Sequence, residues 1–231
     1  MQNKTILVTG ASRGLGRQMV EHYAQHNDVI GLSRSGTGAD HARVTNLSCD
    51  VTNIDDLDVC IETIFKEFPS IDVLINNAAV LKSTPLVLMK DEDILSMIQT
   101  NLVAPILLTK RMVRAMMRQR RGHIVNIVSM SHKLCKPGDS VYAATKAGLE
   151  IFGKVVNVEA HSSGISVNNL AISASPTGML EQITQDDPDK IKSLIPHNQF
   201  AKINDIVSAI DFFCSPDSGD IGGQTVFLGG I

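Results

Sequence analysis

Short apolar runs alternate with amphipathic stretches along the chain. Seven runs are rich in Val and Ile and lack polar alternation, as expected for strands covered on both faces; they span 6–8, 29–32, 44–49, 73–75, 124–128, 165–172 and 225–228. Between them, apolar residues recur at helical spacing over 15–25, 54–68, 91–118, 141–161 and 206–214. This alternation with short connections predicts an α/β protein with a doubly wound parallel seven-stranded sheet and helices on both faces.

One stretch resists assignment to either element. Residues 173–199 contain three prolines and the acidic pair Asp186-Asp187. A long irregular segment inside a compact domain is usually functional or mobile. We therefore expect one domain over residues 1–231, with 173–200 as a lid over a substrate site within it.

The composition argues against several classes of protein. The chain has 231 residues and a formal net charge of -3, which argues against a nucleic-acid partner. The cations at 110–121 are interpreted as the solvated face of a helix. The cysteines have no metal-ligand spacing, so they predict free thiols in a reducing compartment and no metal site; they are Cys49, Cys60, Cys135 and Cys214. With no signal-peptide pattern or membrane-length apolar run, the expectation is a cytoplasmic protein without a membrane partner.

A glycine-rich turn joins the first strand to the first helix. It reads Thr9-Gly10-Ala11-Ser12-Arg13-Gly14-Leu15-Gly16. Glycine permits a tight turn and close approach of a pyrophosphate, and a helix N-terminus offers unpaired N–H groups. The turn predicts a Rossmann fold with a dinucleotide bound at Gly10, Ser12, Arg13, Gly14, Leu15 and Gly16.

Three further positions are candidates for chemistry. Tyr142 and Lys146 stand four apart on a predicted helix, so they share a face, and an ammonium there would lower the phenol pKa. Ser129 ends the fifth strand, at the ligand crevice of such a sheet, where a substrate-binding and a purely structural serine are equally consistent. Asn101 interrupts a helix: it either faces solvent or locally opens the helix and exposes a carbonyl.

Taken together, these motifs resemble the short-chain dehydrogenase/reductase family over essentially the whole chain. Ser129 stands thirteen residues before Tyr142, the separation that the family uses. The matching pieces are Thr9-Gly10-x-x-x-Gly14-x-Gly16, Asp50-Val51, Asn76-Asn77-Ala78, Asn101, Ser129 and Tyr142-x-x-x-Lys146. Within the family, the chain is most similar to the bacterial β-ketoacyl carrier-protein reductases.

The resemblance implies a role for each matching residue. Tyr142 would protonate the carbonyl oxygen, Lys146 would lower the tyrosine pKa and bind the nicotinamide ribose, and Ser129 would position the carbonyl. Asn101 would hold a water that links Lys146 to a proton relay. The remaining cofactor contacts would come from Asp50 and Val51 at the adenine, Asn77 at a ribose, and Ala78 and Thr177.

The end of the second strand indicates which nicotinamide is used. Enzymes that use NAD usually place an acidic residue there, whereas this chain has Ser33 followed by Arg34. Arg13 lies in the glycine turn nearby. Two guanidiniums suit the 2′-phosphate of NADP(H), although both could simply be solvent-exposed. We expect NADP(H).

Two positions depart from the family pattern. Ala79 stands where glycine is usual, and Ile172-Ser173 replaces the Pro-Gly that normally follows the sixth strand. That loop commonly holds the nicotinamide carboxamide in the family. We therefore expect the chain to leave the sixth strand by a different path.

The expected function is NADPH-dependent transfer of a hydride to a ketone or 3-oxoacyl carbonyl, free or carrier-bound, to give an alcohol. The alternatives are an NADP-dependent alcohol dehydrogenase working oxidatively and a non-catalytic dinucleotide sensor. The expected substrate pocket uses Leu81, Ser131, Leu134 and the lid near Met179 and Leu180, with His132 either touching substrate or solvated. The resemblance suggests a homotetramer or homodimer, with Leu107, Leu149, Phe152 and Val156 either as subunit contacts or as part of the chain's own core.

Overall fold

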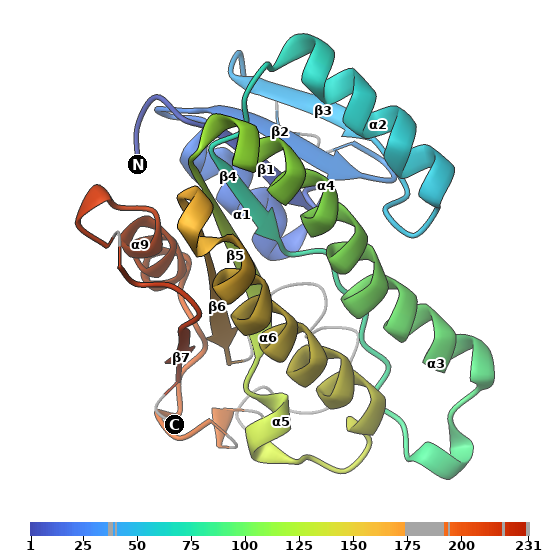
Figure 1. The fold of residues 1–231 in the computed structure, drawn as a ribbon. Helices are drawn as coiled ribbons and strands as arrows, with labels where there is room; N and C mark the ends of the chain where they lie inside the picture. Colours follow the sequence, from blue (N-terminus) through green and yellow to red (C-terminus); the bar gives the residue numbers. More distant parts are fainter. Residues whose placement is uncertain (37–38, 40, 174–191, 194, 219, 230–231) are drawn as a thin grey trace.

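The computed structural model describes residues 1–36, 39, 41–173, 192–193, 195–218 and 220–229. Its centre is one seven-stranded sheet in the order β3-β2-β1-β4-β5-β6-β7 (Figure 1). Every neighbouring pair runs parallel. The strands are β1 (Thr5–Thr9), β2 (Asp28–Ser33), β3 (Val44–Ser48), β4 (Val73–Asn76), β5 (Gly122–Ser129), β6 (Ile165–Ile172) and β7 (Thr225–Leu228). The fold class, a doubly wound Rossmann-type sheet, is confirmed.

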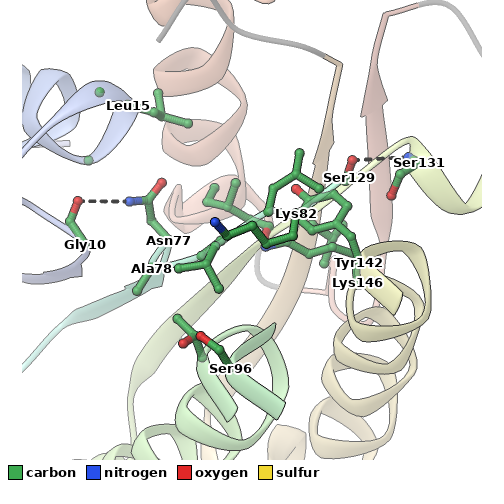
Figure 2. A pocket seen from close by; sticks show the side chains of 18 of the residues that line it. Gly10, Leu15, Asn77, Ala78, Lys82, Ser96, Ser129, Ser131, Tyr142 and Lys146 are labelled. Atoms are coloured by element: carbon green, nitrogen blue, oxygen red, sulfur yellow. Dashed lines mark hydrogen bonds between the residues drawn. The ribbon is translucent and has the colours of Figure 1, made fainter. Parts of the chain in front are cut away.

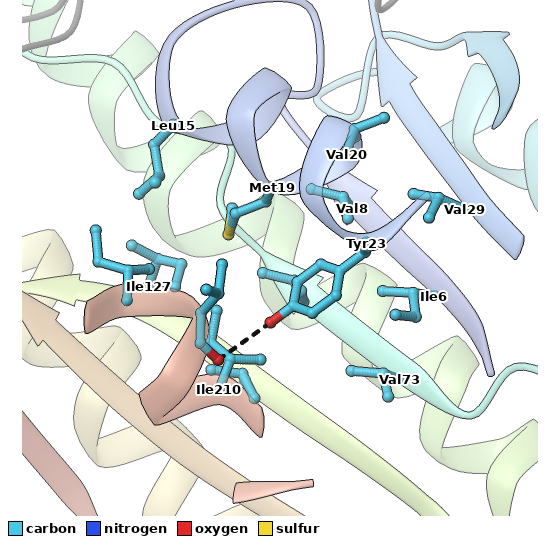
Figure 3. Close-up of a cluster of buried hydrophobic side chains, with 14 of the residues drawn as sticks. Ile6, Val8, Leu15, Met19, Val20, Tyr23, Val29, Val73, Ile127 and Ile210 are labelled. Carbon is cyan, nitrogen blue, oxygen red and sulfur yellow. Dashed lines mark hydrogen bonds between the residues drawn. The ribbon is translucent and has the colours of Figure 1, made fainter. Parts of the chain in front are cut away.

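Helices cover both faces of this sheet. The apolar sides of α1 (Gly14–Tyr23) and α9 (Ile203–Phe213) pack on one face. On the other face pack α2 (Ile54–Glu67), α4 (Ala104–Gln119) and α6 (Ser140–Ala160). Figure 3 shows the first cluster, in which the Tyr23 hydroxyl donates to the Val207 carbonyl at 3.4 Å. Burial on both faces explains why the central strands read as continuous apolar runs.

The predicted helix 91–118 is one rod made of three segments. It begins as α3 (Asp91–Ile98), widens into a π-helical turn over Gln99–Val103, and continues as α4 (Figure 1). Such π-turns are rare and mostly occur at functional sites. Shorter helical elements are the 3₁₀ turns Leu86–Leu88, His161–Ser163 and Pro216–Ser218, and the four-residue α5 (Ser131–Leu134).

A line of buried amides crosses four neighbouring strands. The Asn76 amide donates to Asn126 Oδ1 at 2.9 Å, and the Asn126 amide donates to Asn169 Oδ1 at 3.0 Å. The Asn169 amide reaches Thr225 Oγ1 at 3.4 Å. Helix α6 can approach because Gly153 lies above this line, where an added Cβ would stand 2.5 Å from Asn169 Oδ1. These hydrogen bonds offset much of the penalty for burying the amides, although Asn76 Oδ1 has no partner among the described residues.

The end of β6 stays paired despite the missing Pro-Gly. The Ser173 N–H donates to the Leu228 carbonyl at 3.1 Å, so the pairing with β7 continues one residue past the strand. The path beyond it and most of the expected lid, including Thr177, Met179 and Leu180, lie outside the described residues. In the described part of the chain, none of the helices has the length and apolar character needed to cross a membrane.

Candidate active site

A large cavity opens where the central strands end. It has a volume of about 1190 Å³ and runs from the glycine turn to the start of α6 (Figure 2). Its walls come from the first β–α turn, the carboxyl ends of β2, β4 and β5, and the C-terminal part of α3. In an open parallel sheet, this is the edge at which ligands bind. Its length suits a dinucleotide with a substrate beside it.

The glycine turn is shaped for close approach. Gly10 and Gly14 have φ of +68° and +55°, a region that favours glycine. A Cβ on Gly10 would lie 2.8 Å from the Ala78 backbone, and one on Gly16 would overlap the Gly10 carbonyl. No side chain caps α1, whose N-cap is Arg13. The turn therefore needs glycine at these positions, lines the cavity with close-packed backbone and presents a helix N-terminus to it, as a pyrophosphate site requires.

Thr9 and Asn77 tie this turn to β4. The N–H groups of Asn77 and Ala78 both donate to Thr9 Oγ1 at 3.0 Å. The Asn77 side-chain amide donates to the carbonyl of Thr9 at 2.9 Å and, more weakly, to that of Gly10 at 3.4 Å (Figure 2). Asn77 lines the cavity as expected, but its side-chain nitrogen is already hydrogen-bonded to the protein backbone. Thr9 is not among the predicted site residues. A polar residue at the carboxyl end of a buried strand could have indicated that it lies at the site.

The far end of the cavity carries opposite charges. Ser33, Arg34, Asp50 and Val51 line it, and Arg34 is exposed. Asp50 Oδ1 accepts the Thr52 hydroxyl at 2.7 Å and the Thr52 N–H at 3.0 Å. The hydroxyl bond lowers the pKa of Asp50, and the nearby Arg34 charge adds to this while burial opposes it. Asp50 is therefore an ionised carboxylate with one oxygen already used.

Tyr142 and Lys146 project from one face of α6 into the cavity (Figure 2). Lys146 is 2% exposed, and its Nζ donates to the Ile127 carbonyl at 2.8 Å. Burial lowers the pKa of Lys146 to about 8. The same Nζ lies 5.9 Å from the centre of the Tyr142 ring. Ile127, at a backbone carbonyl, is a further site residue that the sequence did not signal.

The pKa of Tyr142 moves opposite to the expected direction. Burial raises it to about 12, and the negative charge of Asp139 adds to the rise, whereas a hydrogen bond from Ser129 lowers it. The ammonium of Lys146 was expected to lower this pKa. Burial of the phenol dominates instead, since desolvation disfavours the charged form. Tyr142 is consequently a protonated phenol at neutral pH.

Ser129 and Asn101 have different positions relative to the cavity. Ser129 lines it, and its Oγ accepts the Ser131 N–H at 3.1 Å. Asn101 is 0% exposed within the π-turn. Its amide clamps Val80, accepting the N–H at 2.8 Å and donating to the carbonyl at 2.8 Å, and it also donates to Thr145 Oγ1 at 3.3 Å. A solvent-facing Asn101 is therefore wrong. The helix widens locally at this turn, as the other expectation has it, and the exposed carbonyl stays a prediction.

The structure thus gathers the predicted site residues around one cavity, with two exceptions. Asn101 lies beneath the wall, and Thr177 is outside the described residues. All the others line the cavity, namely Gly10, Ser12, Arg13, Gly14, Leu15, Gly16, Ser33, Arg34, Asp50, Val51, Asn77, Ala78, Ser129, Tyr142 and Lys146. The sequence did not point to the two cations that also line it, Lys82 and Lys136.

The substrate side needs one correction. Leu81, Ser131 and Leu134 line the cavity as expected. His132 does not: its side chain is only 14% exposed, and Nε2 lies 3.1 Å from Glu150 Oε2. Both expectations for His132, a substrate contact and a solvated loop residue, are therefore wrong. The reason is a buried carboxylate on α6 that local sequence around His132 cannot reveal.

Comparisons with known proteins agree with this geometry. Residues 4–189 match the family model described as short chain dehydrogenase. The 3-oxoacyl-[acyl-carrier-protein] reductase FabG of Haemophilus influenzae is 35% identical over 237 residues, covering 100% of this chain and 98% of that protein. FabG of Escherichia coli (strain K12) is 35% identical over 236 residues, covering 99% and 97%. The solved structure of ElxO with NADP bound is 26% identical, with a TM-score of 0.89 and coverage of 98% and 97%.

Proposed function

This chain belongs to the short chain dehydrogenase family, and we propose that it reduces the keto group of a 3-oxoacyl thioester to an alcohol. It is an NADP(H)-dependent oxidoreductase of the ketoreductase type. The observation that carries the proposal is the convergence of Ser129, Tyr142 and Lys146 on one cavity that continues to the glycine turn. A sensor or scaffold needs no such proton-transfer group.

The cavity fits a phosphorylated dinucleotide. The glycine turn, where added Cβ atoms would collide with backbone, would hold the pyrophosphate, and Arg13 and Arg34 would bind the 2′-phosphate. Lys146 would bind the nicotinamide ribose. When bound, NADPH supplies the hydride that adds to the carbonyl carbon.

The side chains then handle the oxygen and its proton. The Ser129 hydroxyl would donate a hydrogen bond to the substrate carbonyl and orient it beside Tyr142. As the C–H bond forms and the C=O π bond breaks, the Tyr142 hydroxyl would give its proton to the oxygen. The raised pKa of Tyr142 keeps that proton in place at neutral pH. The tyrosinate formed would be stabilised by the buried Lys146 ammonium and reprotonated from solvent.

Asn101 acts in this proposal through the backbone. Its side-chain amide already binds Val80 and Thr145. The part left to hold a relay water is the main-chain carbonyl within the π-turn. By clamping Val80, which lines the cavity, the side chain would also keep the wall in place.

The substrate class follows from the cavity entrance and the relatives. Leu81 and Leu134 offer an apolar surface for an acyl chain, and Lys82 and Lys136 offer positive charge for a carrier. The FabG relatives are named for acyl-carrier-protein substrates. Residues 173–200 remain our proposed lid within one domain, which is supported by Ser173 and Ile195 lining the cavity on either side of the segment outside the described residues.

We also retain the proposals of a homotetramer or homodimer and of a cytoplasmic location. The expected contacts need revision, because Leu149 and Val156 are buried within the chain's own core. On the outer side of α6, Ile151, Val155 and Val158 are instead exposed, the last by 80%. Four free cysteines support a reducing compartment.

The test is the pair of tyrosine-to-phenylalanine variants. The chain has two tyrosines, so Tyr23→Phe is a matched control that removes a hydroxyl far from the cavity. Tyr142→Phe keeps the ring and removes the proton donor, which should lower kcat by about 10²–10⁴-fold. NADPH oxidation is measured with a 3-oxoacyl thioester, a simple ketone and, in reverse, the matching alcohol with NADP.

The proposal predicts that Tyr142→Phe still binds NADPH and that Tyr23→Phe keeps the parent rate. Activity in Tyr142→Phe close to the parent's would remove the tyrosine from the mechanism. A parent that binds NADPH yet turns over no carbonyl or alcohol would favour the sensor. A preference for simple ketones over thioesters would contradict the proposed substrate class and leave the proposed reaction unchanged.

A further inference from the structure

Helix α5, which starts two residues after Ser129, is joined to α6 by a buried contact between His132 and Glu150. His132 Nε2 lies 3.1 Å from Glu150 Oε2, with side-chain exposures of 14% and 8%. This is the distance of a hydrogen bond in which Nε2–H donates to the carboxylate. Bonds to an ionised partner are about twice as strong as neutral ones. The pair therefore fixes α5 against the helix that carries Tyr142 and Lys146.

Glu150 is itself held from the other side. Its Oε1 accepts the Lys154 ammonium at 2.6 Å and the Thr225 hydroxyl at 3.1 Å, which leaves Oε2 for His132. Burial raises the pKa of Glu150, but the bonds from Lys154 and Thr225 outweigh it and hold the pKa below its usual value. The carboxylate is thus ionised and points one oxygen at α5.

The position of α5 determines a contact to Ser129. The N–H of Ser131, in the first turn of α5, donates to Ser129 Oγ at 3.1 Å. A hydroxyl that accepts from the backbone still has its one proton to donate elsewhere. Four residues cannot form a helix that is stable by itself. We therefore expect the anchor on α6 to help keep the Ser131 N–H in place.

We propose that His132 is a positioning residue: through Glu150 it holds α5 so that the Ser131 N–H binds Ser129 Oγ and the Ser129 proton is directed at the substrate carbonyl. The inference rests on the proposed function, because it requires Ser129 to bind that carbonyl. His132 does not line the cavity, so its effect on the reaction is indirect.

The first test compares three single variants. His132→Ala removes the anchor, His132→Gln keeps an N–H donor, and His161→Ala removes an exposed histidine that follows α6, as a matched control. We expect His132→Ala to lower kcat by about 5- to 100-fold, as small displacements of positioned groups do. His132→Gln should recover most of this loss. His161→Ala should stay within about twofold of the parent, and the KM for NADPH should be unchanged throughout.

The second test asks whether His132 acts through Ser129. In a double-mutant cycle, adding His132→Ala to Ser129→Ala should cost no further turnover, because the contact being protected is already gone. Losses that multiply would overturn the inference. Glu150→Gln keeps the shape of the side chain and removes its charge. If His132→Ala folds poorly, Glu150→Gln replaces it in the test and should show the same loss of turnover.

A crystal structure of His132→Ala separates this inference from the proposed function. We expect α5 to shift and the contact between Ser131 N and Ser129 Oγ to lengthen beyond 3.5 Å, the limit for a hydrogen bond, from the present 3.1 Å. An unmoved α5 with that contact intact would overturn the inference even if the parent reduces ketones. A parent without ketone reduction would overturn the proposed function, and with it this inference.

Discussion

Two arginines and the carboxylate of Asp50 determine the charge at the end of the cavity that would hold the adenosine. Arg13 and Arg34 line it and are exposed, while Ser33 is buried where enzymes that use NAD usually carry an acidic residue. Among the described residues that line this end, Asp50 is the acid, and Thr52 occupies one of its oxygens. Ser33 therefore takes the position at which a carboxylate would repel a 2′-phosphate.

Arg34→Ala tests this arrangement. Only NADPH carries the 2′-phosphate, so the variant should bind NADPH less tightly while its affinity for NADH changes little. A hydrogen bond to a charged group contributes roughly 1.5–3 kcal/mol, and the exposure of Arg34 places the expected loss at the lower end, about tenfold. Fluorescence titration of both cofactors measures it, with Arg43→Ala, an exposed arginine away from the cavity, as control. Equal losses for the two cofactors would contradict a phosphate contact.

At the scale of elements, the π-turn between α3 and α4 brings Asn101 to the cavity wall. The π-turn places the side-chain amide of Asn101 opposite Val80. There the amide binds both the N–H and the carbonyl of Val80, as the backbone of a neighbouring strand would. Gln99, in the same turn, donates its side-chain amide to the Thr52 carbonyl at 3.1 Å. The turn therefore ties two loops of the cavity to one helix.

Asn101→Leu should destabilise the protein strongly. It leaves both the N–H and the carbonyl of Val80 without their partner, and each unsatisfied buried group costs about 1–3 kcal/mol. We expect the free energy of unfolding to fall by about 2–5 kcal/mol in urea denaturation. Gln99→Leu, in the same turn but half-buried, should cost about 1 kcal/mol or less. Equal losses in the two variants would show that the clamp on Val80 is not the stabilising feature.

Features that depend on residues close together in the sequence can be predicted from it, whereas features that depend on contacts between distant residues cannot. Strands, helices and the Tyr142–Lys146 face come from local periodicity, and their predicted ends agree with the structure to within about three residues. The π-turn and the His132–Glu150 pair could not be assigned this way. Asn101 gains its role from Val80, and His132 from a carboxylate on another helix, so both depend on contacts that only the folded chain creates.

At the scale of the whole molecule, the site lowers the stability of the fold that supports it. Lys146 is 2% exposed, and burial lowers its pKa from 10.5 to about 8. The unfolded chain therefore holds this proton more tightly than the folded protein does. Near neutral pH the folded state must keep a buried ammonium, a cost of about 3 kcal/mol for a shift of this size. Its bond to the Ile127 carbonyl offsets part of that cost.

Lys146→Met should therefore be inactive yet more stable than the parent at pH 7, by about 1–2 kcal/mol after the lost hydrogen bond is subtracted. This difference in stability shrinks as the pH rises. Because the folded pKa lies below the unfolded one, the parent gains stability as pH rises from about 8 towards 10.5, whereas the variant does not. Urea denaturation of both proteins at pH 7 and pH 10 measures this convergence, and Lys110→Met, at an exposed position, controls for general charge effects. A constant difference between Lys146→Met and the parent at both pH values would mean that the buried ammonium carries no such cost.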